Sequence, residues 1–166
     1  DRIEKFLKTK LPLIIKNQRN LKKNSLFDPL SEAEQFKLSK IFMEKLGFDF
    51  SRGRIDKSLH PFCGGSSQDI RITTRFDKSD SFSCFDALMH ETGHALYEQG
   101  LPKKRLHQPL GLAGGMSLHE SQSLFIEMQI IKSLSVSQFI EKIIKKDIGK
   151  KNDVWNAANI YKARKQ

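Results

Sequence analysis

The sequence contains the motif H-E-x-x-H, formed by His90, Glu91 and His94 within the stretch MHETGHALYEQG at residues 89–100. Two histidines four residues apart on a helix project from one face, one turn apart, so both imidazoles can reach a single metal ion. Glu91 lies beside that face and can reach a water molecule near the metal without being a ligand itself. The spacing therefore predicts a metal site with a general base, provided that the stretch is helical.

A third metal ligand is available in the stretch SLHESQS at residues 117–123, which contains Glu120. Catalytic zinc sites use three protein ligands and leave a fourth position for water, and two imidazoles with one carboxylate suit Zn²⁺. Ser117 and Glu120 also have the spacing of a helix capping box, which would give Glu120 a structural role instead. We interpret Glu120 as a ligand because it accompanies H-E-x-x-H, and His119 as a structural or supporting residue.

These residue types suit hydrolysis of a peptide bond. A zinc ion lowers the pKa of water that it binds towards about 7 and polarises the substrate carbonyl. Glu91 would accept a proton from the attacking water as general base and would then return that proton to the leaving amine. The hypothesis from the motifs is a zinc-dependent peptidase.

The H-E-x-x-H motif lies within a predicted helix at about residues 80–99. Asp80 or Ser81 can cap the beginning of this helix, and Gly100 marks its end. Gly93 lies inside the motif, where it lowers helix propensity by about 1 kcal/mol relative to alanine. The small size of Gly93 would allow another backbone to approach closely.

Further amphipathic helices are expected on both sides of this helix, which predicts a mainly α-helical chain. One of them has a capping box at Ser31 and Glu34 and a helix-ending glycine at Gly47. Pro12 is expected to bend the first helix or to mark its restart. The predicted helices cover residues 2–16, 31–46, 117–134, 135–148 and 153–164.

The stretch DIRITTRF at residues 69–76 is the clearest β-strand. Apolar residues alternate in it with Asp69, Arg71, Thr73 and Arg75, which share the opposite face. This polar face is either the solvent-exposed side of an edge strand or a polar wall of a substrate cleft. In the second case Arg71 and Arg75 are candidate cations for a substrate carboxylate.

The composition fits one domain spanning residues 1–166, with 38% hydrophobic residues. We expect no membrane span, because no apolar run approaches about 18 residues, and no signal peptide, because charges interrupt the N-terminal stretch. The cytoplasm is therefore the expected location. Cys63 and Cys84 are expected to be free thiols, with a disulfide as the alternative.

The net charge of +10 raises nucleic-acid binding as another possible function. Basic side chains cluster at residues 19–23, 103–105 and 142–151. These clusters are scattered and lack interleaved aromatic residues, and no known nucleic-acid-binding motif accompanies them. We interpret them as a solvated, lysine-rich surface and do not expect a nucleic-acid partner.

Four motifs occur in an order that resembles a known family. HPFCGG, DIRITTRF, HETGHALYEQGLP and GMSLHESQS, between about residues 46 and 128, closely resemble the bacterial thermostable carboxypeptidase Taq family of HExxH zinc metallocarboxypeptidases. The resemblance implies that His90, His94 and Glu120 bind the metal and that Glu91 is the catalytic base. It also implies a helical, zincin-like metallopeptidase core with a small β-sheet beside the active-site cleft.

The same resemblance implies a cofactor, a substrate class and further site residues. The metal would be Zn²⁺ or Co²⁺, the reaction would remove C-terminal residues from peptides, and the enzyme would form a homodimer. His60 of the HPF motif and the strand at residues 69–73 would lie near the cleft. This makes His60, Asp69, Arg71 and Arg75 candidate substrate-binding residues.

The chain departs from the family pattern in its extent. Family members are longer, with a large helical N-terminal part and with later I-R-x-x-A-D and G-x-x-Q-D-x-H-W motifs that help to bind substrate, and this sequence contains neither motif. It also does not begin with methionine. We therefore expect a partial metallocarboxypeptidase catalytic domain, with two alternatives. It is either catalytically competent, alone or with a complementary fragment of a split enzyme, or an inactive remnant.

Overall fold

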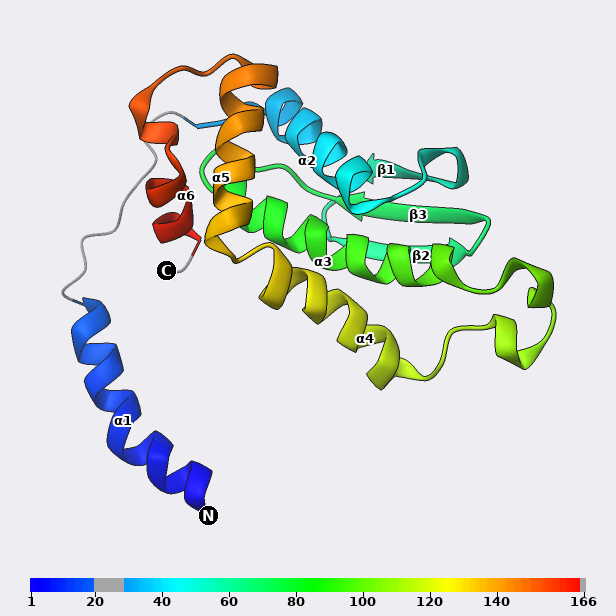
Figure 1. The fold of residues 1–166 in the computed structure, drawn as a ribbon, viewed down its shortest axis with the longest axis horizontal. Coiled ribbons are helices and arrows are strands. Elements are labelled where there is room, and N and C mark those ends of the chain that lie inside the picture. Colours follow the sequence, from blue (N-terminus) through cyan, green and yellow to red (C-terminus); the bar gives the residue numbers. More distant parts are fainter. Residues whose placement is uncertain (20–28, 165–166) are drawn as a thin grey trace.

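The computed structural model describes residues 1–19 and 29–164 of the chain, so that residues 20–23 of one basic cluster lie outside the described part. Figure 1 shows a mainly helical fold with a small sheet, which confirms the predicted fold class. The described α-helices are α1 (Arg2–Arg19), α2 (Glu32–Leu46), α3 (Ser81–Gly100), α4 (Met116–Leu124), α5 (Leu134–Ile143) and α6 (Ala157–Ala163).

The sheet has three strands, β1 (Gly53–Lys57), β2 (Phe62–Ser66) and β3 (Asp69–Thr74), in the order β1-β3-β2. β3 pairs in parallel with β1 and antiparallel with β2, so it is the central strand and the edge-strand alternative is wrong. Ile70, Ile72 and Thr74 of β3 are fully buried, as the alternating pattern predicts.

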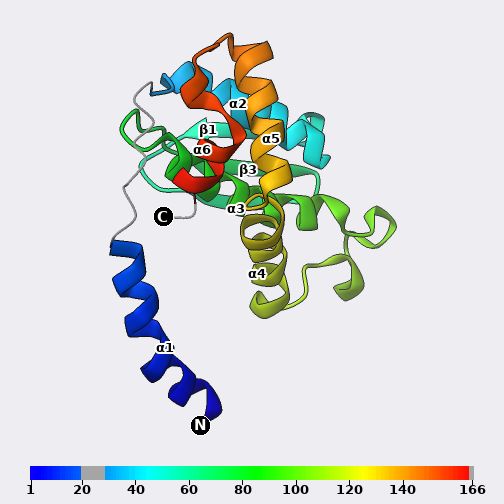
Figure 2. The same cartoon turned by 60° about the vertical axis from the view of Figure 1, so that its left-hand side comes forward.

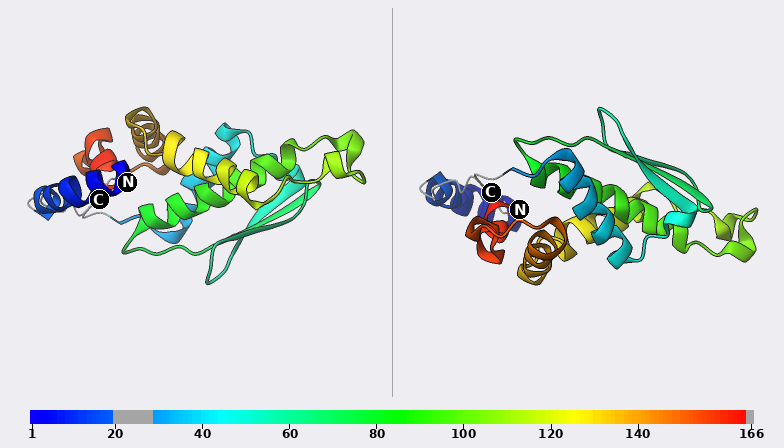
Figure 3. Two further views of the ribbon diagram at one scale, coloured as in Figure 1. Left: turned by 90° about the horizontal axis from the view of Figure 1, so that it is seen from below. Right: turned by 90° about the horizontal axis from the view of Figure 1, so that it is seen from above.

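Helix α3 is the central element of the fold. It packs against β2, β3, α2 and α4, and in Figure 3 the sheet lies on one side of α3 and α4 on another. Asp80 caps its N-terminus by accepting a hydrogen bond from the Ser83 backbone N–H. Leu88, Met89 and Ala95 are completely buried along α3, so the helix that carries the H-E-x-x-H motif is also the centre of the hydrophobic core.

Helix α2 has the N-terminal capping box and the C-terminal glycine that the sequence predicts. The Ser31 hydroxyl accepts from the Glu34 backbone N–H, and the Glu34 carboxylate accepts from the Ser31 backbone N–H, which completes the capping box. Gly47 ends the helix with φ of 100°, a left-handed conformation that glycine adopts without steric cost. Helix α2 is thereby fixed at both ends beside α3.

The segment after Met116 differs from the single helix predicted at residues 117–134. Helix α4 ends at Leu124 and continues as a π-helical turn at Phe125–Ile130, and α5 begins separately at Leu134. A second π-helical turn, Ile144–Ile148, follows α5, and a 3₁₀ turn at Asp153–Trp155 precedes α6. A π-helical turn changes which side chains face a neighbouring element, because it inserts an extra residue into the helical repeat.

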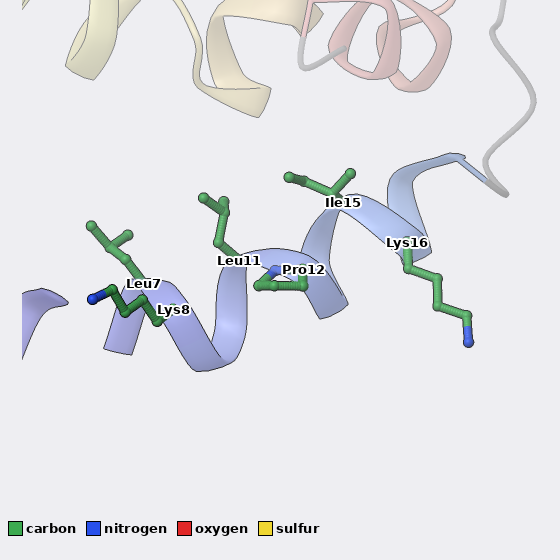
Figure 4. A pocket seen from close by; sticks show the side chains of 6 residues that line it. All are labelled: Leu7, Lys8, Leu11, Pro12, Ile15 and Lys16. Atoms are coloured by element: carbon green, nitrogen blue, oxygen red, sulfur yellow. The ribbon is translucent and has the colours of Figure 1, made fainter. Parts of the chain in front are cut away.

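Helix α1 extends away from the rest of the described chain (Figures 1 and 2). It is helical through Pro12 and carries the apolar face that the sequence predicts, but its large apolar side chains are exposed. Figure 4 shows Leu7, Leu11 and Ile15 pointing from one side of α1 and Lys16 from another. No helix among the described residues is both long enough and apolar enough to cross a membrane.

The backbones of α3 and α4 approach each other closely at Gly93. A Cβ atom on this residue would lie 2.5 Å from Cα of Ser123 and 2.8 Å from the carbonyl oxygen of Gln122. Both are backbone atoms, which cannot rotate away as the end of a flexible side chain could. The close approach expected from the small size of Gly93 is therefore present, and its partner is α4.

Replacement of Gly93 by alanine is expected to destabilise the fold by about 1–3 kcal/mol, because the added methyl group forces α3 and α4 apart. This expected loss is net of the gain of about 1 kcal/mol in helix propensity that alanine provides. The measurement is urea-induced unfolding followed by circular dichroism. Gly100→Ala is the matched control, because a Cβ there meets no atom within 4 Å. Equal unfolding midpoints for the two variants would contradict the packing argument.

Candidate metal centre

Helices α3 and α4 bring the three predicted ligands together. His90 and His94 lie one turn apart on α3, and one ligand atom from each of them and from Glu120 of α4 lies within 4.8 Å of the other two. The Glu120 carboxylate is 3.3 Å from Nε2 of His94 and 3.7 Å from Nε2 of His90. Two imidazole nitrogens and a carboxylate converging in this way fit a divalent metal such as zinc.

The other ring nitrogen of each histidine is already engaged, which leaves both Nε2 atoms for a metal. Nδ1 of His90 lies 2.8 Å from the carboxylate of Glu127, in the π-helical turn after α4. Nδ1 of His94 lies 2.6 Å from Nδ1 of His119. A ligand histidine whose second nitrogen is held by a hydrogen bond has a fixed tautomer and ring orientation.

Glu120 does not serve as part of a helix cap in this structure. Helix α4 begins at Met116 with Gly115 at the N-cap, and Gly115 has no side chain to accept a capping hydrogen bond. Ser117 therefore lies inside the first turn, where it cannot act as the N-cap residue of a capping box. The carboxylate of Glu120 is left to face the two histidines.

Glu91 borders a pocket of about 580 Å³ that also contains His90 and Glu127. Pro61, from the loop before β2, lines the same pocket, as do Lys132 and Arg164. Partial burial raises the pKa of the Glu91 carboxyl above its usual range, an effect that His90 opposes and Glu120 reinforces. A carboxyl with a raised pKa is a stronger base than an ordinary one, which suits the role of general base.

The four candidate substrate-binding residues are not among those that line the pocket beside Glu91. Arg71 donates two hydrogen bonds of 2.7 and 2.6 Å to the carboxylate of Asp69, on the face of β3 opposite its buried residues. Arg75 follows β3 and is exposed, as is His60. Among the described residues, no hydrogen bond or ion pair links these four side chains to His90, His94 or Glu120. Their substrate-binding role stays a prediction.

Sequence reasoning missed several residues that the structure places around the site. Glu127 contacts His90, and Glu98 lies 2.9 Å from Nε2 of His119. The spacing could have indicated Glu98, because it follows His94 by four residues and therefore shares the same face of the helix. Glu127 could not be found from α-helical spacing alone, because it lies in the π-helical turn.

The core helix, the two histidines one turn apart and the carboxylate on a neighbouring helix form the arrangement that is typical of helical metallopeptidases of the H-E-x-x-H class. Comparison with known proteins identifies the family. The model of the carboxypeptidase Taq (M32) metallopeptidase family matches residues 1–166, and the chain belongs to that family. This confirms the family that the four sequence motifs indicate.

Individual relatives agree with the family match. The chain is 41% identical to carboxypeptidase 1 of Bacillus subtilis (strain 168) over 95 residues, 57% of this chain and 19% of that protein. It is 38% identical to thermostable carboxypeptidase 1 of Thermus thermophilus over 107 residues, 64% of this chain and 21% of that protein. The structure of Trypanosoma cruzi metallocarboxypeptidase 1 superposes with a TM-score of 0.84 and 34% identity, over 96% of this chain and 32% of that one.

The chain therefore spans about a fifth of the length of these two relatives and about a third of the solved structure. The similarity to the solved structure nevertheless covers nearly all of the present chain.

Cys63 of β2 provides a chemical probe of the site, because it is a free thiol close to Glu91 and Glu98. Burial, together with these two carboxylates, raises the pKa of the Cys63 thiol to about 12. Since the thiolate is the reactive form, Cys63 should be alkylated by iodoacetamide at least about tenfold more slowly in the folded chain than in urea at pH 9. Its rate should still rise above pH 9.

Peptide mapping by mass spectrometry distinguishes Cys63 from Cys84 in this experiment. With a chelator present, Glu91→Gln should lower the pKa of Cys63 and speed its alkylation, because a nearby negative charge is removed. His107→Gln, a change in an exposed loop residue, is the control and should have no effect. A folded-state rate that levels off near pH 9 would contradict the raised pKa.

Proposed function

We propose that the chain carries the metal centre of a zinc-dependent metallocarboxypeptidase, which hydrolyses C-terminal residues from peptides. The observation that carries this proposal is the convergence of His90, His94 and Glu120 within 4.8 Å, beside a partly buried Glu91. Membership of the metallocarboxypeptidase family supports the reaction type. Zn²⁺ fits the donor set, and Co²⁺ accepts the same ligands.

Each side chain has a distinct role in the proposed reaction. His90, His94 and Glu120 would hold the ion, which supplies a Lewis acid for the scissile carbonyl and for the attacking water. Glu91 accepts a proton from the water and delivers it to the leaving amine, and its raised pKa favours the first of these transfers. Lys132 and Arg164 line the same pocket as Glu91.

We also propose that residues 1–166 belong to one catalytic domain, whose partner is a second copy or a complementary fragment. The family match over all of these residues supports the single domain. The exposed apolar face of α1 supports a protein partner, because an exposed apolar face of this kind is usually covered in an assembly (Figure 4).

Replacing His90 by alanine removes one of three ligands and is expected to reduce bound zinc from one ion per chain to a small fraction of that. Zinc content after dialysis, measured by atomic absorption, tests this. His107→Ala is the matched control, since His107 is exposed and outside the cluster. Equal, negligible zinc in the wild-type chain and in His90→Ala would refute the metal-site proposal.

Replacing Glu91 by glutamine should leave zinc binding intact and lower hydrolysis of peptide C-terminal residues by about 10²- to 10⁴-fold, because the general base is lost. The assay follows release of free amino acid from blocked dipeptides and longer peptides. Activity that survives in Glu91→Gln would contradict the assigned role. Zinc binding without any hydrolysis by the wild-type chain would favour the alternative, a catalytically inactive remnant.

The protein partner can be tested through α1. Replacing Leu11 by glutamate places a charge in the apolar face and should weaken self-association, which light scattering coupled to size-exclusion chromatography measures as a lower mass. Lys16→Glu is the control, because Lys16 points from another side of the helix (Figure 4). A wild-type chain that stays monomeric at every concentration would exclude the second copy and leave the complementary fragment.

A further inference from the structure

The second nitrogen of His94 is supported differently from that of His90. His90 contacts the Glu127 carboxylate directly, whereas His94 contacts a second imidazole, that of His119. His119 in turn contacts the carboxylate of Glu98 at 2.9 Å. Three side chains therefore form a continuous hydrogen-bonded row, Glu98–His119–His94, which ends at a proposed metal ligand.

With both imidazoles neutral, the Glu98 carboxylate fixes the direction of every hydrogen bond in the row. A carboxylate can only accept, so Nε2 of His119 must carry the proton that is donated to Glu98. In a neutral imidazole the other nitrogen is then an acceptor, so Nδ1 of His119 accepts from Nδ1–H of His94. This leaves the lone pair of His94 on Nε2, the atom that lies 3.3 Å from Glu120.

His119 is held in place from several directions, as a positioning residue must be. Its ring lies 4.6 Å from that of His94, with an angle of 34° between the planes, and makes an edge contact with Tyr97. The hydroxyl of Tyr97 accepts a hydrogen bond from the Gly114 backbone N–H, which ties α3 to the loop before α4. The side chains of His94, His119 and Glu98 are only 12%, 19% and 23% exposed, so water competes little for these bonds.

We propose that His119 is a positioning residue that holds His94 in the Nδ1–H tautomer, with Glu98 setting the tautomer of His119. This inference rests on the proposed metal site, but it also makes a claim about the metal-free chain. The row keeps Nε2 of His94 unprotonated and correctly aimed before any ion arrives. Metal binding then requires no change of tautomer at His94.

The test uses two substitutions at His119 in the full chain. His119→Phe keeps a ring of similar size but removes the acceptor, so His94 should lose its tautomer preference. His119→Asn should restore it, because the Asn side-chain oxygen can occupy the position of Nδ1 and accept the same hydrogen bond. Nitrogen-15 chemical shifts of the histidine rings at about pH 8, where ordinary histidines are neutral, report the tautomer directly.

Zinc affinity, measured by competition with a chromophoric chelator, provides the second readout. His119→Phe should bind zinc about 10- to 100-fold more weakly than the wild type, and His119→Asn should recover most of that loss. Glu98→Ala breaks the row from its partly exposed end and serves as a second variant should His119→Phe fail to fold. His107→Phe, in an exposed loop, controls for the substitution itself.

The outcomes separate this inference from the proposed function. An unchanged His94 tautomer and unchanged zinc affinity in His119→Phe would overturn the positioning role while leaving the metal site intact. A wild-type His94 protonated on Nε2 would also overturn it. A His94 held in the Nδ1–H form in a wild-type chain that binds no zinc would support the positioning role and refute the proposed metal centre.

Discussion

The close approach of α3 and α4 at Gly93 is the constraint on which the candidate metal centre depends. A Cβ atom at this position would lie 2.5 Å from the α4 backbone, closer than van der Waals contact allows, so any side chain would hold the helices further apart. Glu120 lies one turn before Ser123, the residue that Gly93 contacts. Since a glutamate side chain has limited reach, its contacts with both histidines require this short separation between the helices. The glycine thus costs helix propensity but allows three ligands to converge.

This contact is lined by complementary polar groups. Along α3 the residues His90, His94 and Glu98 recur every four positions, and the facing segment supplies Glu127, Glu120 and His119. The Nδ1 atoms of His90 and His94 and both ring nitrogens of His119 have hydrogen-bond partners, so these partly buried polar groups are paired, while Glu120 and the two Nε2 atoms are left for a metal. A buried polar group without a hydrogen-bond partner costs free energy. A network in which the polar groups are paired therefore stabilises the contact, and one in which some are unpaired destabilises it. The same pairing that holds α4 against α3 therefore also orients the ligands.

The sequence predicted the elements whose signals are local. The helix around His90, its Asp80 cap, the capping box at Ser31 and the buried alternation of Ile70 and Ile72 all depend on residues within a few positions of one another. The prediction from sequence failed for features whose structure depends on residues that are distant in the sequence. β3 is central because β1 and β2 pair on its two sides, although both of those strands contain glycine and neither has a clear apolar alternation. The π-helical turn after Leu124 likewise has no sequence signature here, and it determines where Glu127 points.

The basic residues discussed above differ in how strongly a neighbouring carboxylate engages their charge, and this affects whether each could bind a substrate carboxylate. Arg71 is neutralised by Asp69 on the far face of the sheet, and the buried Arg164 is neutralised by Asp86, with which it makes hydrogen bonds of 2.6 and 3.1 Å. Lys132 differs from both. Its carboxylate neighbour, Glu127 at 3.7 Å, is already hydrogen-bonded to His90, and Lys132 lines the same pocket as Glu91. A lysine whose acidic neighbour is shared with a metal ligand retains more of its charge for an incoming anion than an arginine in a bidentate pair. Among these three cations, Lys132 therefore has the charge that is least engaged by hydrogen bonds to a carboxylate.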